Sequence, residues 1–160
     1  MKYNLTFAFL IMFSLTYGQS IAEKDSINEN PNYDKALAEE LGGDEYGMKS
    51  YFLVILKTGT NTTKDQDLIS KSYRRHLDNI NRLVDEKKLI LVGPLGKNEQ
   101  NYRGIFILDG MESLEEAKEV LQTDLAIRND LLDYEIFPWY GSAALPEYLS
   151  YSDKIWKTKP

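Results

Sequence analysis

Residues 49–57 read KSYFLVILK, and the fold can be worked out from this stretch. Its six central residues, Tyr51 to Leu56, are all apolar. An apolar run of this length is typical of a strand that is covered on both faces, so we expect a central strand of a sheet here. Residues 58–63 are rich in glycine, threonine and asparagine, which predicts a loop after the strand.

A long amphipathic helix is predicted over residues 64–87. Apolar side chains recur there at alternating spacings of four and three, which places them on one face of the helix. This face also carries the only histidine of the chain. Its members are Ile69, Tyr73, His76, Leu77, Ile80, Leu83 and Val84.

Further strands and a second helix complete the pattern. The strands are predicted at 89–92, 102–108 and 131–140, the first two joined as a hairpin. Residues 113–116 form a capping box, which predicts the start of a helix that ends before residue 122. The order β-α-β-β-α-β is the ferredoxin-like split βαβ arrangement, an α+β fold. It has a four-stranded antiparallel sheet with both helices on one face.

The sheet face away from the helices also needs a cover, because the first and last strands are apolar on both sides. A second copy of the same sheet provides a matching apolar surface. We therefore expect a homodimer formed through this face.

The segments on either side of the domain differ from it in composition. Residues 1–18 combine Lys2, an apolar run and the small residues Thr16 and Gly18 before Gln19, as in a cleaved secretory signal peptide. The run is shorter than a membrane-spanning helix requires. Residues 19–47 are a polar linker with a short helix near 32–41, residues 48–141 the domain, and residues 142–160 an aromatic-rich tail. We expect an exported bacterial protein, periplasmic or secreted, without membrane contact after cleavage.

Composition and missing motifs exclude several functions. A formal charge of −6 without a basic cluster argues against a nucleic-acid partner. With no cysteine and one histidine, neither a disulfide nor a structural zinc site is expected, and we predict no cofactor. Glu112, Glu115, Glu116 and Glu119 gather where the second helix starts. They are explained by the helix dipole, with a cation site as the alternative.

Several short motifs follow one another in a fixed order. They are His76-Leu77, Leu89 to Pro94, Gly104 to Leu108, Gln122 to Asp124 and Tyr134 to Trp139. In order and spacing they resemble the YCII-related (YciI-like) domain family, and the match covers residues 48–141. The resemblance implies a dimeric α+β-barrel fold of the ferredoxin-like type. Family members usually have proline after the aspartate, whereas this chain has Leu125.

The resemblance also implies a site. A histidine on the first helix and an aspartate after the second helix face one cleft in the family, and here they correspond to His76 and Asp124. Asp124 would orient the ring, and His76 would act as general base or acid. Relatives include an enzyme that eliminates HCl from a chlorinated aromatic, so lyase-type proton-transfer chemistry on a small molecule is implied. Tyr73, Arg103 and Trp139 are the candidate substrate-binding residues.

Spacing alone leaves alternatives open. His76 is also explained as a core-edge histidine, Tyr73 and Trp139 as packing residues, and Arg103 as a surface cation. Three functions remain: a small-molecule enzyme, a non-catalytic dimeric binding module, and an assembly role for the aromatic tail. The enzyme requires His76 and Asp124 within hydrogen-bond reach in an open cleft, whereas the assembly role predicts a filled cleft.

Overall fold

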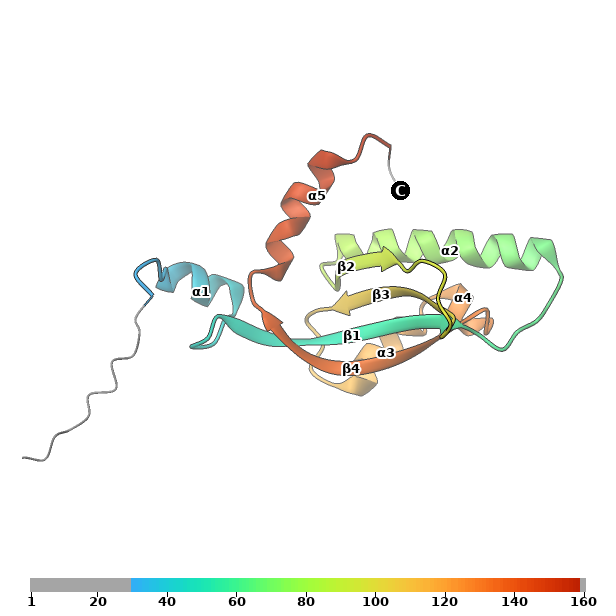
Figure 1. The fold of residues 1–160 in the computed structure, drawn as a ribbon, viewed down its shortest axis with the longest axis horizontal. Coiled ribbons are helices and arrows are strands. Elements are labelled where there is room, and N and C mark those ends of the chain that lie inside the picture. Colours follow the sequence, from blue (N-terminus) through green and yellow to red (C-terminus); the bar gives the residue numbers. More distant parts are fainter. Residues whose placement is uncertain (1–29, 159–160) are drawn as a thin grey trace, which may run out of the picture. The chain divides into compact units, whose positions relative to one another are not determined.

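The computed structural model describes residues 30–158, and residues 34–158 belong to one compact unit (Figure 1). The predicted signal peptide at residues 1–18 lies outside the described residues, so export stays a prediction. Within residues 30–158, none of the helices combines the length and the apolarity that crossing a membrane requires.

The sheet has four antiparallel strands in the order β2-β3-β1-β4, which confirms the predicted ferredoxin-like fold. The strands are β1 (Met48–Thr58), β2 (Leu89–Pro94), β3 (Tyr102–Leu108) and β4 (Leu132–Ser142). The apolar run of residues 51–56 forms the middle of β1, which pairs with β3 on one side and β4 on the other. Pro94 and Pro138 lie in the two edge strands, where a missing N–H removes no central ladder bond.

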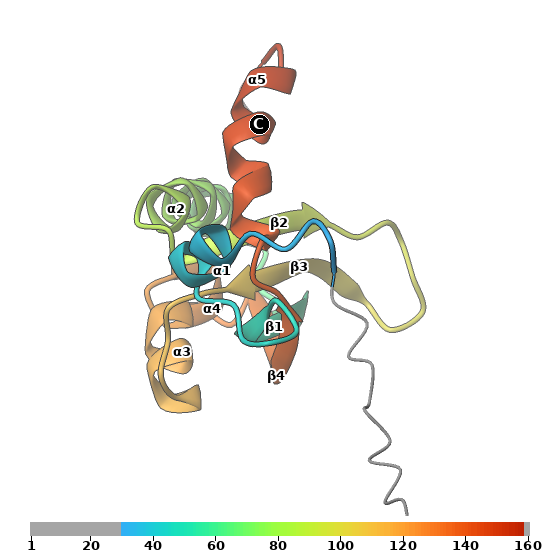
Figure 2. The ribbon, with the colours of Figure 1, turned by 90° about the vertical axis from the view of Figure 1, so that its left-hand side faces the viewer.

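Three helices cover one face of the sheet, as Figure 2 shows for α2, α3 and α4. The bounds of the α-helices within residues 30–158 are α1 (Lys35–Leu41), α2 (Gln66–Asp85), α3 (Leu114–Leu121), α4 (Leu125–Arg128) and α5 (Leu149–Ile155). The predicted capping box forms at α3, where Ser113 Oγ accepts a hydrogen bond from Glu116 N at 3.1 Å. In a capping box the glutamate side chain accepts a hydrogen bond from the N–H of the N-cap residue. Here the Glu116 carboxylate accepts instead from the N–H of Glu112, the residue before the N-cap, at 2.9 Å. The Glu116 carboxylate therefore helps to cap the helix itself.

The main core lies between this face and the helices. Val54 and Leu56 of β1 and Phe106 of β3 point toward it and meet Leu83 of α2. A second, smaller cluster lies on the opposite face around Tyr51. Its other members are Ile90, Ile107, Leu53, Leu91, Trp139, Leu145 and Leu149.

The tail takes part in this second cluster. After β4, the chain forms the short 3-10 helix η1 (Leu145–Tyr148), which leads directly into α5. Leu145 and Leu149 pack against the second cluster, so the tail covers one end of the open sheet face. The outer residues of α5 remain exposed, and Ile155 is 83% exposed.

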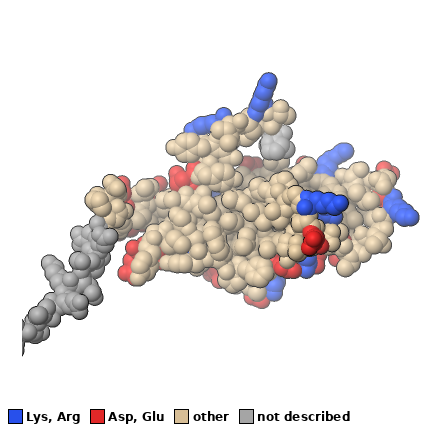
Figure 3. Space-filling model, in the orientation of Figure 1, with Lys and Arg blue, Asp and Glu red and all other residues tan. Residues whose placement is uncertain are grey.

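The rest of the open face is apolar and only partly covered. Leu53 and Ile55 of β1 are half-buried, as is Ile105 of β3. Phe137 of β4 is 44% exposed. In Figure 1, α3 and α4 lie behind the strands, so Figure 3 shows this face, and a broad area of it carries no charged side chain.

Candidate functional site

His76 and Asp124 meet between α2 and α4. The Nδ1 atom of His76 lies 2.5 Å from Oδ2 of Asp124, and their side chains are 12% and 1% exposed. An ionised carboxylate can only accept hydrogen bonds, so Nδ1 carries the ring hydrogen. The lone pair of the neutral imidazole then lies on Nε2, which is the atom available as a base.

Asp124 is also the N-cap of α4. Its Oδ1 accepts a hydrogen bond from Ala126 N at 2.8 Å, while Oδ2 faces His76. Both carboxylate oxygens are thus engaged, which fixes the orientation of the group. Leu125 occupies the first helical position, where proline is typical of the YCII-related family, and the cap forms without it.

A second contact joins α4 to α2 at the other end of α4. Asn129, the C-cap residue, donates from Nδ2 to Ser72 Oγ at 2.9 Å. Ser72 is fully buried and lies one helical turn before His76. In addition, Asn61 of the loop before α2 donates from Nδ2 to Asn129 O at 2.8 Å. These bonds hold the two helices together independently of the imidazole–carboxylate contact.

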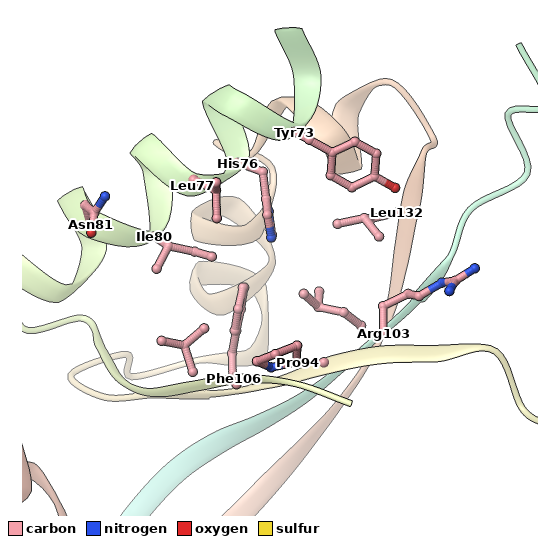
Figure 4. A pocket seen from close by; sticks show the side chains of 13 residues that line it. Tyr73, His76, Leu77, Ile80, Asn81, Pro94, Arg103, Phe106 and Leu132 are labelled. Carbon is pink, nitrogen blue, oxygen red and sulfur yellow. The ribbon is translucent and has the colours of Figure 1, made fainter. Parts of the chain in front are cut away.

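The imidazole opens onto a cavity of about 660 Å³ between α2 and the β2–β3 hairpin (Figure 4). Within residues 30–158, Nε2 has no hydrogen-bond partner. Every fully buried side-chain nitrogen or oxygen of these residues does have a partner, so Nε2 cannot be one of the fully buried atoms and is accessible. The ring of His76 lies nearly parallel to that of Phe106, with centroids 6.1 Å apart. Most of the remaining wall is apolar: Leu56, Leu77, Ile80, Val92, Pro94 and Leu132.

The structure brings two of the predicted substrate-binding residues to this cavity. Tyr73 and Arg103 both line it, and the ring of Tyr73 stands edge-on to His76, with centroids 6.5 Å apart. Trp139 is not brought there. It pairs with Tyr51 on the opposite sheet face, and the two ring centroids are 5.5 Å apart.

Other residues at the site were not predicted. Phe106 follows Gly104 by two positions in β3, and residues two apart in a strand lie on the same face. This alternation could have predicted that both residues face the helices. Asn81 lies on the edge of the helical stripe and adds an amide to the wall. The Ser72–Asn129 contact has no local sequence signal, because the two residues are 57 positions apart.

The described residues offer no metal site. Within residues 30–158, no three histidine, cysteine, aspartate or glutamate side chains lie close enough together to hold an ion. What the arrangement can do is accept or donate a proton at Nε2, with Asp124 behind the ring to stabilise the imidazolium.

Comparisons with known proteins leave the family open. No family model matches the chain, and no curated protein matches it. One similar solved structure is a 5-chloro-2-hydroxyhydroquinone dehydrochlorinase from Burkholderia phenoliruptrix AC1100 in complex with 2,5-dihydroxybenzoquinone. It is 21% identical, the match covers 56% of this chain and 92% of that chain, and the TM-score is 0.38. A likeness of this extent does not establish the family, so membership in the YCII-related family stays a prediction.

Asn129 and Ser72 form a clamp between the C-terminal end of α4 and α2, and Ser72→Ala tests this clamp. This change removes the acceptor of Asn129 Nδ2, and we expect a loss of about 1–2 kcal/mol in the free energy of unfolding. Amide hydrogen exchange in residues 125–129 should become faster. Ser70→Ala, at an exposed position on the same helix, is the matched control. It should change the free energy of unfolding by no more than roughly 0.5 kcal/mol and leave the exchange rates of residues 125–129 unchanged. Equal effects of the two changes would contradict the clamp.

Proposed function

We propose that the protein is an exported small-molecule enzyme in which His76 transfers a proton through Nε2. The observation that carries this proposal is the 2.5 Å contact between His76 Nδ1 and Asp124 Oδ2, combined with the access of Nε2 to the cavity. A buried carboxylate on Nδ1 holds the ring in one tautomer and stabilises the imidazolium that forms when Nε2 takes a proton. A histidine that only fixed α4 to α2 would not need its Nε2 to open onto a cavity.

The cavity suits a flat and largely apolar substrate. Its volume of about 660 Å³ falls within the usual range of small-molecule sites. The rings of Phe106 and Tyr73 and several aliphatic side chains form most of its wall, with the polar groups of His76, Asn81 and Arg103 between them. We expect an aromatic or similarly flat molecule in which one polar group meets the imidazole.

The reaction that we propose is an elimination of the lyase type. The base removes a proton from the substrate, and a leaving group departs with the electron pair of its bond, so the substrate loses one molecule of an acid. His76 can take the proton at Nε2 and pass it to the leaving group or to water. This reaction needs only the acid–base pair and a water-poor cavity.

Removal of the base tests the proposal. With 5-chloro-2-hydroxyhydroquinone as the first probe, we expect the protein to release chloride. We expect His76→Ala to lower the rate roughly 10²–10⁴-fold. Asp124→Asn should also lower it strongly, because an amide can donate to Nδ1 and leave the ring hydrogen on Nε2. Asparagine is a good N-cap, so α4 should persist in this variant, as circular dichroism can check.

Arg74→Ala is the control for these variants, because Arg74 is exposed on α2 and does not line the cavity. Its rate should equal that of the unchanged protein. Binding of hydroxylated aromatics without turnover of any of them would contradict the enzyme and support the non-catalytic binding module.

The open face of the sheet is the surface through which we expect the homodimer to form. Phe137 lies on this face and is 44% exposed. Phe137→Asp would place a charge in the interface, so we expect sedimentation velocity to show a shift from dimer to monomer. Leu77→Asp places the same charge on the helix side, at a position 53% exposed, and should leave the dimer intact. A monomeric unchanged protein would contradict this interface.

A further inference from the structure

Arg103 reaches the cavity because of an irregularity in the sheet. Leu56 of β1 pairs with Gly104 of β3, but the next pair is Lys57 with Tyr102. Arg103 is therefore an extra residue in β3. Regular alternation would place its side chain on the face opposite to Gly104, whereas the bulge allows it to border the cavity on the helix side.

The guanidinium group of Arg103 is held by the end of β1. Its Nε donates to Thr58 Oγ1 at 2.7 Å. The Thr58 hydroxyl donates in turn to Asn101 O at 3.4 Å, and Thr58 N donates to the same carbonyl at 3.2 Å. This arrangement uses Nε alone. Within residues 30–158, the terminal nitrogens of Arg103 have no ion-pair or hydrogen-bond partner, and their fork matches a carboxylate.

No acidic side chain of the described residues lines the cavity to neutralise Arg103. Asp124 lies behind the imidazole, with both oxygens engaged. Asp133 and Glu135 of β4 pair instead with Lys57, at 3.3 and 3.4 Å. The hydrogen bond that Lys57 donates to Asp133 holds the pKa of Lys57 above its ordinary value. The cavity thus has a positive end, although the protein carries a formal charge of −6.

The positive end lies to one side of the histidine. In Figure 4, Arg103 and the hydroxyl end of Tyr73 lie toward the same end of the cavity, whereas Ile80 and Asn81 lie toward the other end. We propose that the substrate is a flat apolar molecule that carries a carboxylate, and that Arg103 binds this carboxylate while Nε2 of His76 acts on another part of the molecule. This inference rests on the proposed function, and it assigns the substrate class and the residue that selects it.

A matched pair of probes tests the inference. Benzoate and benzamide have nearly the same shape and differ in charge. By isothermal titration, we expect the unchanged protein to bind benzoate at least about tenfold more tightly than benzamide, because a charge-assisted contact to arginine is stronger than a neutral one. Arg103→Gln should remove this preference. Thr58→Val should reduce it, because the guanidinium loses its hydrogen-bond partner.

Two further readouts separate this inference from the proposed function. His76→Ala should keep the preference for benzoate, since the anion is bound by Arg103, even if turnover is lost. Raising the salt concentration should weaken the binding of benzoate more than that of benzamide. Equal affinities for the two probes, binding of neither, or a preference that survives Arg103→Gln would overturn the inference. A rate unaffected by His76→Ala would instead overturn the proposed function alone.

Discussion

The hydrogen bonds that join α4 to α2 are the constraint on which the site depends. A helix of four residues, Leu125 to Arg128, is far too short to be stable alone. It exists because each of its two ends is fixed to α2: Asp124 meets His76 at the N-terminal end, and Asn129 meets Ser72 at the C-terminal end. The same contacts place a buried carboxylate directly behind an imidazole. Structure and chemistry therefore depend on the same pair of helices, since the Asn129–Ser72 contact keeps α4 beside α2 while the Asp124–His76 contact orients the ring.

The cavity in front of the imidazole exists because β3 lacks a side chain there. Gly104 faces the helices beside Leu56, and a Cβ at this position would lie 2.9 Å from the carbonyl oxygen of Gly93. A larger residue would push β2 away and fill the floor of the cavity. Phe106, the next residue on this face, then forms the wall against which the ring of His76 lies. The Phe106 ring gives a flat substrate an apolar surface to pack against beside the imidazole.

The sequence predicts the layers of this protein better than it predicts the site. The apolar run of residues 51–56 and the stripe of residues 69–84 report their own local periodicity, and both elements form where they are expected. Tertiary contacts decide the rest. The last strand is apolar on both faces, so the sequence does not show which face Trp139 lies on. Its pairing opposite Tyr51 shows that it lies away from the cavity. The partnership of His76 with Asp124 spans 48 positions and came from the family resemblance, because no spacing rule connects the two residues.

We infer that Asp124 fixes the ring of His76 with the hydrogen on Nδ1 and the lone pair on Nε2. Because the chain has a single histidine, the ¹⁵N spectrum of protein labelled at histidine and freed of any affinity tag contains one pair of ring signals. At a pH where the ring is neutral, we predict that Nδ1 has the chemical shift of a protonated ring nitrogen and Nε2 that of an unprotonated one. The reverse assignment, with the hydrogen on Nε2, would contradict this role of Asp124, because the cavity would then face a donor in place of a base.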